Sequence, residues 1–183
     1  DTLDAERWLY CHRPATQSVD QLLAALTANP LVDYAEPDYV GTGGVVPNDP
    51  SFGAQWHHRN NGTTNAVRPD IRSTNAWSIT TGSSNVILAV LDTGIATGNV
   101  EFAGRLLPGY DYANSDNTPS DDQGHGTAVA GDAAANGNNA NLVAGVDWLC
   151  RILPVKVLDS SNSGLYSWWS SGIAFAVAQG AAV

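Results

Sequence analysis

The stretch that decides the fold is VILAVLDTGI, residues 86–95, in which six consecutive apolar residues lead directly into Asp92. An apolar run without polar alternation predicts a strand buried on both faces, as in a parallel sheet covered by helices. Segments 105–112 and 152–158 are predicted as further strands. Because proline cannot donate to a strand ladder, Pro154 indicates that the last of these strands lies near a sheet edge or a bulge.

Two helices are predicted between and after these strands. Residues 125–135 are rich in alanine with Gly131 inside, which suits a helix packed closely against its neighbours, and residues 165–179 carry apolar side chains every fourth position. A shorter helix is expected over 71–77. Strands alternating with helices predict an α/β fold with a mainly parallel sheet.

The first 46 residues differ from this pattern and predict a small module of their own. Residues 19–26 read as an amphipathic helix capped by Ser18, and residues 31–36 alternate apolar and polar side chains like a half-buried strand. A stretch rich in glycine, proline and asparagine follows over 41–50 and predicts a linker. We therefore expect two parts, residues 1–46 and 47–183.

Composition excludes several classes of function. Eighteen Asp plus Glu against eight Lys plus Arg give a net charge of −10, which repels phosphate backbones and argues against nucleic-acid binding. No apolar run approaches the roughly 20 residues needed to cross a bilayer, so no membrane partner is expected. The chain has no methionine and ends on an apolar run, which predicts a piece of a longer protein.

The two cysteines, Cys11 and Cys150, are far apart in the sequence and do not form the clustered set that a metal site needs. The simpler interpretation is two buried or unpaired thiols. A disulfide from Cys150 to a residue beyond Val183 is the alternative.

The chemistry-bearing residues are Asp92 and His125, and His125 lies in the run GHGTAVAG, residues 124–131. An aspartate at the carboxyl end of a buried strand can accept the Nδ1 proton of a histidine, fix its tautomer and stabilise its protonated form. Glycines on both sides of His125 allow close backbone approach. Each residue alone is typical of a turn or loop, but the pair in this order predicts two members of a Ser-His-Asp triad.

Three blocks carry a family resemblance: VLDTGI (residues 90–95), GHGTAVAG (124–131) and ILPVKVLD (152–159). They resemble successive blocks of the subtilisin-like serine proteases, the subtilases (peptidase family S8), over about residues 47–183. The resemblance implies an incomplete three-layer fold, serine endopeptidase activity on protein or peptide substrates, and secretion. It assigns Asp92 as the residue that orients the base and His125 as the general base. Ala128 departs from the family pattern, where many members have a second histidine that is not the proton carrier.

The family's serine and its oxyanion-hole asparagine have no match before Val183, so this chain alone is expected to be inactive. The serines considered as substitutes fall in a predicted turn and a predicted helix and are simplest as capping and surface residues. They are Ser160, Ser161, Ser163, Ser167, Ser170 and Ser171. The aromatic stretch 165–169 lies where the family begins one wall of its substrate cleft, although packing is the simpler role for at least one of its tryptophans.

The resemblance extends to the N-terminal module. Residues 34–38, YAEPD, look like the end of a subtilase propeptide, which folds the enzyme, inhibits it intramolecularly and is then cleaved. The cut is expected between about Val40 and Asn48. An ordinary N-terminal extension is the alternative.

The loop NGNNANL, residues 136–142, supplies oxygen ligands of the kind that calcium prefers. By resemblance to the family, Asp49, Glu101 and Asn139 hold the places of calcium ligands. A plain solvated loop is the alternative.

Two other functions are open at this point. The triplet 92–94, DTG, is also the signature of aspartic proteases, but these need a second carboxylate and a mainly β fold. A subtilase-like domain that has lost its nucleophile and serves as a binding module is the other candidate.

Overall fold

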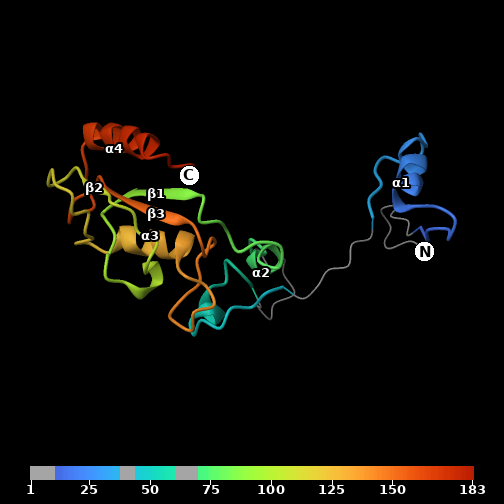
Figure 1. Ribbon diagram of the computed structural model, residues 1–183, viewed down its shortest axis with the longest axis horizontal. Helices are drawn as coiled ribbons and strands as arrows, with labels where there is room; N and C mark the ends of the chain where they lie inside the picture. The colour runs from blue at the N-terminus through green and yellow to red at the C-terminus, as the bar shows by residue number, and fades with distance from the viewer. Residues whose placement is uncertain (1–10, 38–43, 61–69) are drawn as a thin grey trace. The chain divides into compact units, whose positions relative to one another are not determined.

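A parallel sheet of three strands organises the larger part of the molecule (Figure 1). In the computed structural model, β1 (Ile87–Asp92) and β2 (Tyr110–Asp111) lie on either side of β3 (Arg151–Lys156). Both outer strands run parallel to β3, and Asp92 pairs with Lys156 at the end of the register. The predicted α/β fold with a parallel sheet is confirmed.

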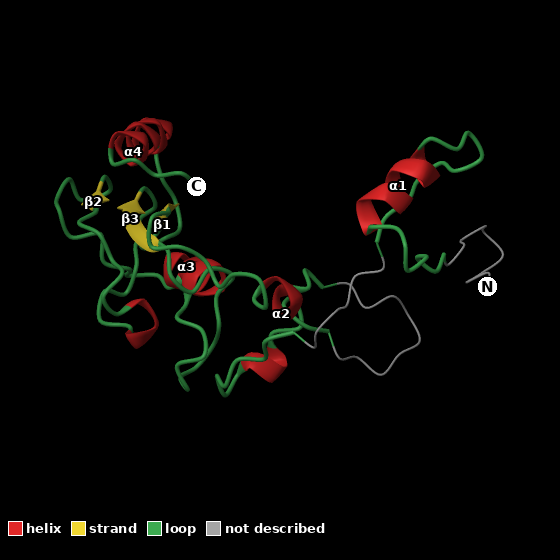
Figure 2. Ribbon diagram, turned by 45° about the vertical axis from the view of Figure 1, so that its right-hand side comes forward, coloured by secondary structure: helices red, strands yellow, loops and turns green. Residues whose placement is uncertain are grey.

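The sheet is covered on both faces, by α3 (His125–Ala134) and by α4 (Tyr166–Ala178) (Figure 2). Alternate residues of β1 and β3 belong to two separate cores, because successive side chains of a strand point to opposite faces. The core beneath α3 contains Val90, Ile95, Phe102, Ala130, Ala134, Cys150 and Ile152. The core beneath α4 contains Ile87, Leu153, Val155, Val157 and Ala176.

The structure describes residues 11–37, 44–60 and 70–183, and the chain divides into two units, residues 1–41 and 42–183. The smaller unit contains α1 (Val19–Thr27). As predicted, Ser18 caps this helix: its hydroxyl accepts from the Gln21 amide, and the Gln21 side chain accepts from the Ser18 amide. These two bonds satisfy donors that a helix start otherwise leaves open.

The strand predicted over 31–36 is wrong. These residues form a turn and an irregular segment, and Leu31 and Tyr34 are exposed. A strand needs a neighbouring strand to satisfy its backbone groups, and among the described residues no strand ladder or bridge includes residues 31–36. The end of the predicted propeptide motif, Asp38, lies outside the described residues.

Pro154 lies in the central strand, so the expectation of an edge position is wrong, but the expectation of a bulge is confirmed. Leu106 pairs with Ile152 and Tyr110 with Val155, which leaves one extra residue on the segment facing Pro154. The backbone amide and carbonyl of Ile152 hydrogen-bond to this segment. Because backbone groups alternate sides along a strand, the backbone nitrogen of Pro154 faces the same segment. The missing N–H of Pro154 therefore falls where the hydrogen-bond ladder between the two strands is already interrupted. The same interruption makes β2 shorter than the predicted strand over 105–112.

The two cysteines differ in their surroundings. Cys11 is exposed and Cys150 is buried, and both are free thiols. Burial raises the pKa of Cys150 to about 11, so its thiol stays protonated and packs as an apolar group. In the described parts of the chain, no helix has the length and apolar character required to cross a membrane.

An aromatic cluster forms where the short helix α2 (Ser73–Ala76) and the segment 52–58 meet the loop before β3. Its buried members are Phe52, Trp77, Ala144 and Trp148. His58 is fully buried beside them, with Nδ1 2.8 Å from the Ser73 hydroxyl and Nε2 2.9 Å from the Ala144 carbonyl. A carbonyl only accepts, so Nε2 carries the proton and Nδ1 accepts from Ser73.

The close contact between α3 and the sheet occurs at Gly126 and not at Gly131. A Cβ on Gly126 would lie 2.2 Å from the Gly94 carbonyl oxygen and 3.0 Å from the Asp92 Cβ, whereas one on Gly131 would have open space around it. The first turn of α3 therefore lies directly against the backbone that follows β1.

The two glycines of α3 give a matched pair of predictions. Gly126→Ala should destabilise the larger unit by about 1–3 kcal/mol because the backbone must shift to admit the methyl group. Gly131→Ala should be neutral or stabilising by about 0.5–1 kcal/mol, since alanine is the better helix residue. Denaturant unfolding followed by tryptophan fluorescence measures both, and equal effects would contradict the placement of the contact.

His58 gives a prediction on pH. Burial lowers the pKa of His58, and the nearby His57 adds to this, while the Ala144 carbonyl and Asp132 oppose it. His58 therefore binds a proton more readily in the unfolded chain than in the folded one. The free energy of unfolding should fall as the pH drops from about 7 through the ordinary pKa of histidine. His58→Gln should remove this part of the pH dependence, and His12→Gln, on the surface of the other unit, should retain it. Parallel stability curves for the wild type and His58→Gln would contradict the prediction.

Candidate active site

Asp92 is the last residue of β1, and the apolar strand before it fixes its position at the carboxyl edge of the sheet. The residue is 7% exposed, and its Oδ1 accepts from the Thr93 amide at 2.7 Å. Functional groups in open parallel sheets gather at this edge. Asp92 is therefore a buried carboxylate held at the place where the fold presents chemistry.

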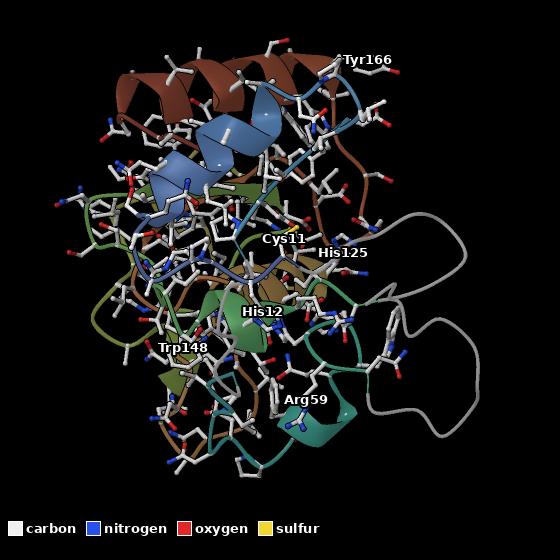
Figure 3. All side chains as sticks on the ribbon, turned by 90° about the vertical axis from the view of Figure 1, so that its right-hand side faces the viewer. Cys11, His12, Arg59, His125, Trp148 and Tyr166 are labelled. Carbon is white, nitrogen blue, oxygen red and sulfur yellow. The ribbon has the colours of Figure 1, made fainter. Side chains whose placement is uncertain are left out.

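His125 is the first residue of α3 and is labelled in Figure 3. Gly124 before it has φ of +107°, a conformation that side chains disfavour, and this sharp turn starts the helix. The His125 amide donates to Gln123 Oε1 at 2.8 Å. Its ring is about half exposed, at 52% of the side chain.

The structure brings the two predicted catalytic residues together. His125 Nδ1 lies 2.7 Å from Asp92 Oδ1 and 2.9 Å from Oδ2. An ionised carboxylate only accepts hydrogen bonds, so Nδ1 carries the ring proton and donates a hydrogen bond to Asp92. The Nε2 atom of the same half-exposed ring is then left as a proton acceptor, which is the arrangement of a general base.

Asp121 holds the two halves of this pair in place, although sequence reasoning missed it. Its Oδ1 accepts from the Thr93 hydroxyl and from the amides of Gln123 and Gly124, and its Oδ2 accepts from the amide and hydroxyl of Thr127. Partial burial alone would raise the pKa of Asp121, but these hydrogen bonds outweigh it and hold the pKa far below its usual range. The available signal was an aspartate four residues before His125.

Lys156 is the second residue that sequence reasoning missed. It is fully buried at the end of β3, and its Nζ donates to the Thr93 carbonyl at 2.6 Å and to Asp122 Oδ1 at 2.7 Å. A buried ammonium group needs such partners. The signal was a single lysine, the only one in the chain, inside a predicted apolar strand.

The structure also places the three predicted calcium ligands side by side. The backbone amide of Asn139 donates to Asp49 Oδ1 at 3.3 Å, and the Asn139 side-chain Nδ2 donates to Glu101 Oε2 at 3.0 Å. Asp49 and Glu101 are buried, and Glu101 Oε1 has no hydrogen-bond partner among the described residues. Among those residues no three or more His, Cys, Asp or Glu side chains cluster so that they could hold a metal ion, and the present set has two carboxylates and one amide.

The serines considered as substitute nucleophiles do not meet the base. In the part of the chain that the structure describes, no serine hydrogen-bonds to His125. Ser167, Ser170 and Ser171 lie in α4, where the Ser170 hydroxyl donates to the Tyr166 carbonyl.

The aromatic stretch 165–169 has mixed surroundings. Trp168 packs against the core beneath α4, whereas Tyr166 is 93% exposed at the start of that helix (Figure 3). One tryptophan thus has a packing role, and a substrate subsite formed by the other aromatic residues stays a prediction.

Known proteins are similar to this chain in sequence and in fold. The chain is 39% identical over 167 residues to the thermophilic serine proteinase of Bacillus sp. strain AK1, covering 91% of this chain and 39% of that protein. It is 38% identical over 138 residues to thermitase of Thermoactinomyces vulgaris, covering 75% and 46%. A solved protease of Pseudoalteromonas arctica PAMC 21717 has a TM-score of 0.60 at 33% identity, covering 75% of this chain and 45% of that one. The chain therefore spans less than half the length of these relatives.

A family profile agrees with the individual relatives. The profile described as the subtilase family, Peptidase_S8, matches residues 83–183, which include β1, α3, β3 and α4. The aspartic-protease interpretation of residues 92–94 is thereby wrong. By its sequence and its parallel sheet, the chain belongs to the subtilase family of serine proteases.

Proposed function

We propose that this chain supplies the aspartate and the histidine of a serine endopeptidase triad, with the serine contributed by residues beyond Val183. The observation that carries the proposal is the 2.7 Å contact between His125 Nδ1 and Asp92 Oδ1, in a side chain that is about half exposed. A buried carboxylate against one nitrogen and an accessible second nitrogen is what proton transfer to and from a nucleophile requires.

The mechanism follows from this geometry. A serine hydroxyl near His125 Nε2 would lose its proton to that atom as its oxygen attacks the substrate carbonyl, and the ring would then return the proton to the leaving amine. Asp92 would stabilise the charged ring and keep Nδ1 as the donor throughout. The donors for the developing oxyanion would come from outside this chain.

We further propose that residues 1–46 are the C-terminal part of an inhibitory propeptide and that residues 47–183 are the first part of the catalytic domain. The partition into units of residues 1–41 and 42–183 supports a separately folded N-terminal module. Cleavage between about Val40 and Asn48 would release the enzyme from its zymogen. Part of that interval, residues 40–43, lies outside the described residues.

Protein and peptide substrates and secretion complete the proposal. Two relatives are described as extracellular proteases, and one as a major intracellular serine protease. The net charge of −10 supports solubility and gives no basis for a nucleic-acid partner.

We also infer a structural calcium ion held by Asp49, Glu101 and Asn139. Two buried carboxylates both accept from Asn139, Asp49 from its backbone amide and Glu101 from its side chain, and the partnerless Glu101 Oε1 provides an oxygen that a hard cation would satisfy. The ion would neutralise buried negative charge and tie residues 48–49 to the loop after α3. It would have no part in the chemistry.

The catalytic proposal is tested with the protein extended beyond Val183, assayed on an unstructured protein substrate. His125→Ala should lower kcat/KM by about 10⁴-fold or more, because the general base is lost, and Asp92→Asn should lower it by about 10⁴-fold, because the ring loses its orientation. His12→Ala, outside the proposed catalytic part, should retain wild-type cleavage of substrate.

Full cleavage by His125→Ala would contradict the assignment of the base. If the extended wild type neither cleaves substrate nor reacts with a fluorophosphonate probe of active serines, the chain belongs instead to a non-catalytic subtilase-like binding domain. That alternative predicts that substrate peptides bind without being hydrolysed.

The calcium proposal is tested by thermal unfolding of the chain with calcium or with a chelator. Calcium at a hundredfold excess over its Kd should stabilise the larger unit by about 2.7 kcal/mol. Glu101→Gln should lose most of this response. Asp159→Asn is the control, since that carboxylate accepts the amides of Ser161 and Ser163 in a different loop. An equal calcium response in the wild type and Glu101→Gln would overturn the site.

A further inference from the structure

Thr93 connects the two elements that carry the catalytic pair. It directly follows Asp92 and is fully buried. Its hydroxyl accepts from the Gly126 amide at 2.8 Å and donates to Asp121 Oδ1 at 2.8 Å. One side chain after β1 is therefore bonded both to the residue that follows His125 and to the loop that precedes it.

Asp121 completes the connection from the other side. Its two oxygens accept five hydrogen bonds, which come from the Thr93 hydroxyl, the amides of residues 123 and 124, and both the amide and the hydroxyl of Thr127. Thr127 Oγ1 in turn accepts from the Ala96 amide at 2.9 Å. The backbone on both sides of His125 is thus tied to the backbone that follows Asp92.

A second connection reaches the carbonyl of the same threonine. Lys156 Nζ donates to Thr93 O and to Asp122 Oδ1, so the neighbouring aspartate fixes Thr93 through a buried lysine. The hydroxyl and the carbonyl of Thr93 are both held by the segment 121–122, directly in one case and through Lys156 in the other.

We propose that Asp121, acting through Thr93 and Thr127, is a positioning residue that sets the orientation of the His125 ring toward Asp92. The inference rests on the proposed role of His125 as the general base. It assigns Asp121 no contact with substrate and no proton transfer.

The chemistry explains why this position needs a carboxylate. All five groups that point at Asp121 donate, and an ionised carboxylate offers only acceptors. An asparagine would present an NH₂ group to at least one of these donors, so one bond would be replaced by a repulsive contact. The hydrogen bonds also hold the pKa of Asp121 well below its usual range, so the carboxylate stays ionised across the neutral and mildly acidic range.

The test is the tautomer of the His125 ring, read from its ¹⁵N chemical shifts in the 183-residue chain, with no cleavage assay. In the wild type the neutral ring should carry its proton on Nδ1. Asp121→Asn and Thr93→Val should each lower the ratio of the Nδ1–H to the Nε2–H form by roughly tenfold or more, the scale of one hydrogen bond to a charged group. Thr93→Ser retains the hydroxyl and should restore the wild-type ratio.

Two controls separate positioning from general destabilisation. Asp147→Asn removes the same charge from a carboxylate that accepts the amides of Leu149 and Cys150 at the opposite end of β3, and its ratio should equal that of the wild type. Amide hydrogen exchange of β3 shows whether each variant is folded. If Asp121→Asn does not fold, Thr93→Val against Thr93→Ser tests the same connection.

The double variant Asp121→Asn/Thr93→Val supplies the deciding comparison. If the two residues act as one unit, the double variant should be no worse than the poorer single variant. An unchanged tautomer ratio in the folded single variants, or fully additive losses, would overturn the proposal. Either result would leave the protease proposal standing, and absence of cleavage in the extended protein would leave the tautomer result unaffected.

Discussion

The rest of the site depends on the contact between the first turn of α3 and the backbone that follows β1. At Gly126 even a methyl group would collide with the Gly94 carbonyl and approach the Asp92 side chain. This absence of a side chain lets His125 begin its helix within hydrogen-bond distance of Asp92. The sheet register supports the same contact, because β1 and β3 are aligned so that Asp92 and Lys156 are paired at the carboxyl ends of the two strands.

Three carboxylates gather around this contact, and each has a different partner. Asp92 hydrogen-bonds to the His125 ring, Asp121 accepts from backbone amides and hydroxyls, and Asp122 accepts from the buried Lys156. Neighbouring like charges repel one another unless each is compensated by its own partner. In a chain with a net charge of −10, the only lysine is buried against one of these three carboxylates.

Sequence reasoning recovered the parts of the fold that local patterns determine. The uninterrupted apolar run of β1 and the four-residue spacing of α4 each reflect burial against a neighbour, and the pair Asp92 and His125 follows from the ends of such elements. It failed where the outcome depends on a distant partner. Residues 31–36 alternate like a strand but belong to no strand ladder among the described residues. Pro154 is tolerated in the central strand because the facing segment has an extra residue.

The missed site residues have the same cause. Asp121 and Lys156 acquire their roles from Thr93, which is 28 residues before one and 63 before the other. No periodicity of the sequence reports such a contact. The three predicted calcium ligands were found by resemblance to a family, and the structure does bring them together through contacts that span up to 90 residues.

The energetics of the Asp92–His125 pair support the proposed catalytic role over a binding role that has no nucleophile. Burying a carboxylate is costly unless hydrogen bonds compensate for the lost water, and an apolar residue at the end of β1 would serve packing at least as well. The structure instead retains a buried Asp92 in contact with one nitrogen of a His125 ring that is about half exposed. Because the pair is complete within residues 92–127, a nucleophile need only be placed beside Nε2. Such an arrangement supports the proposed transfer of a proton at that atom.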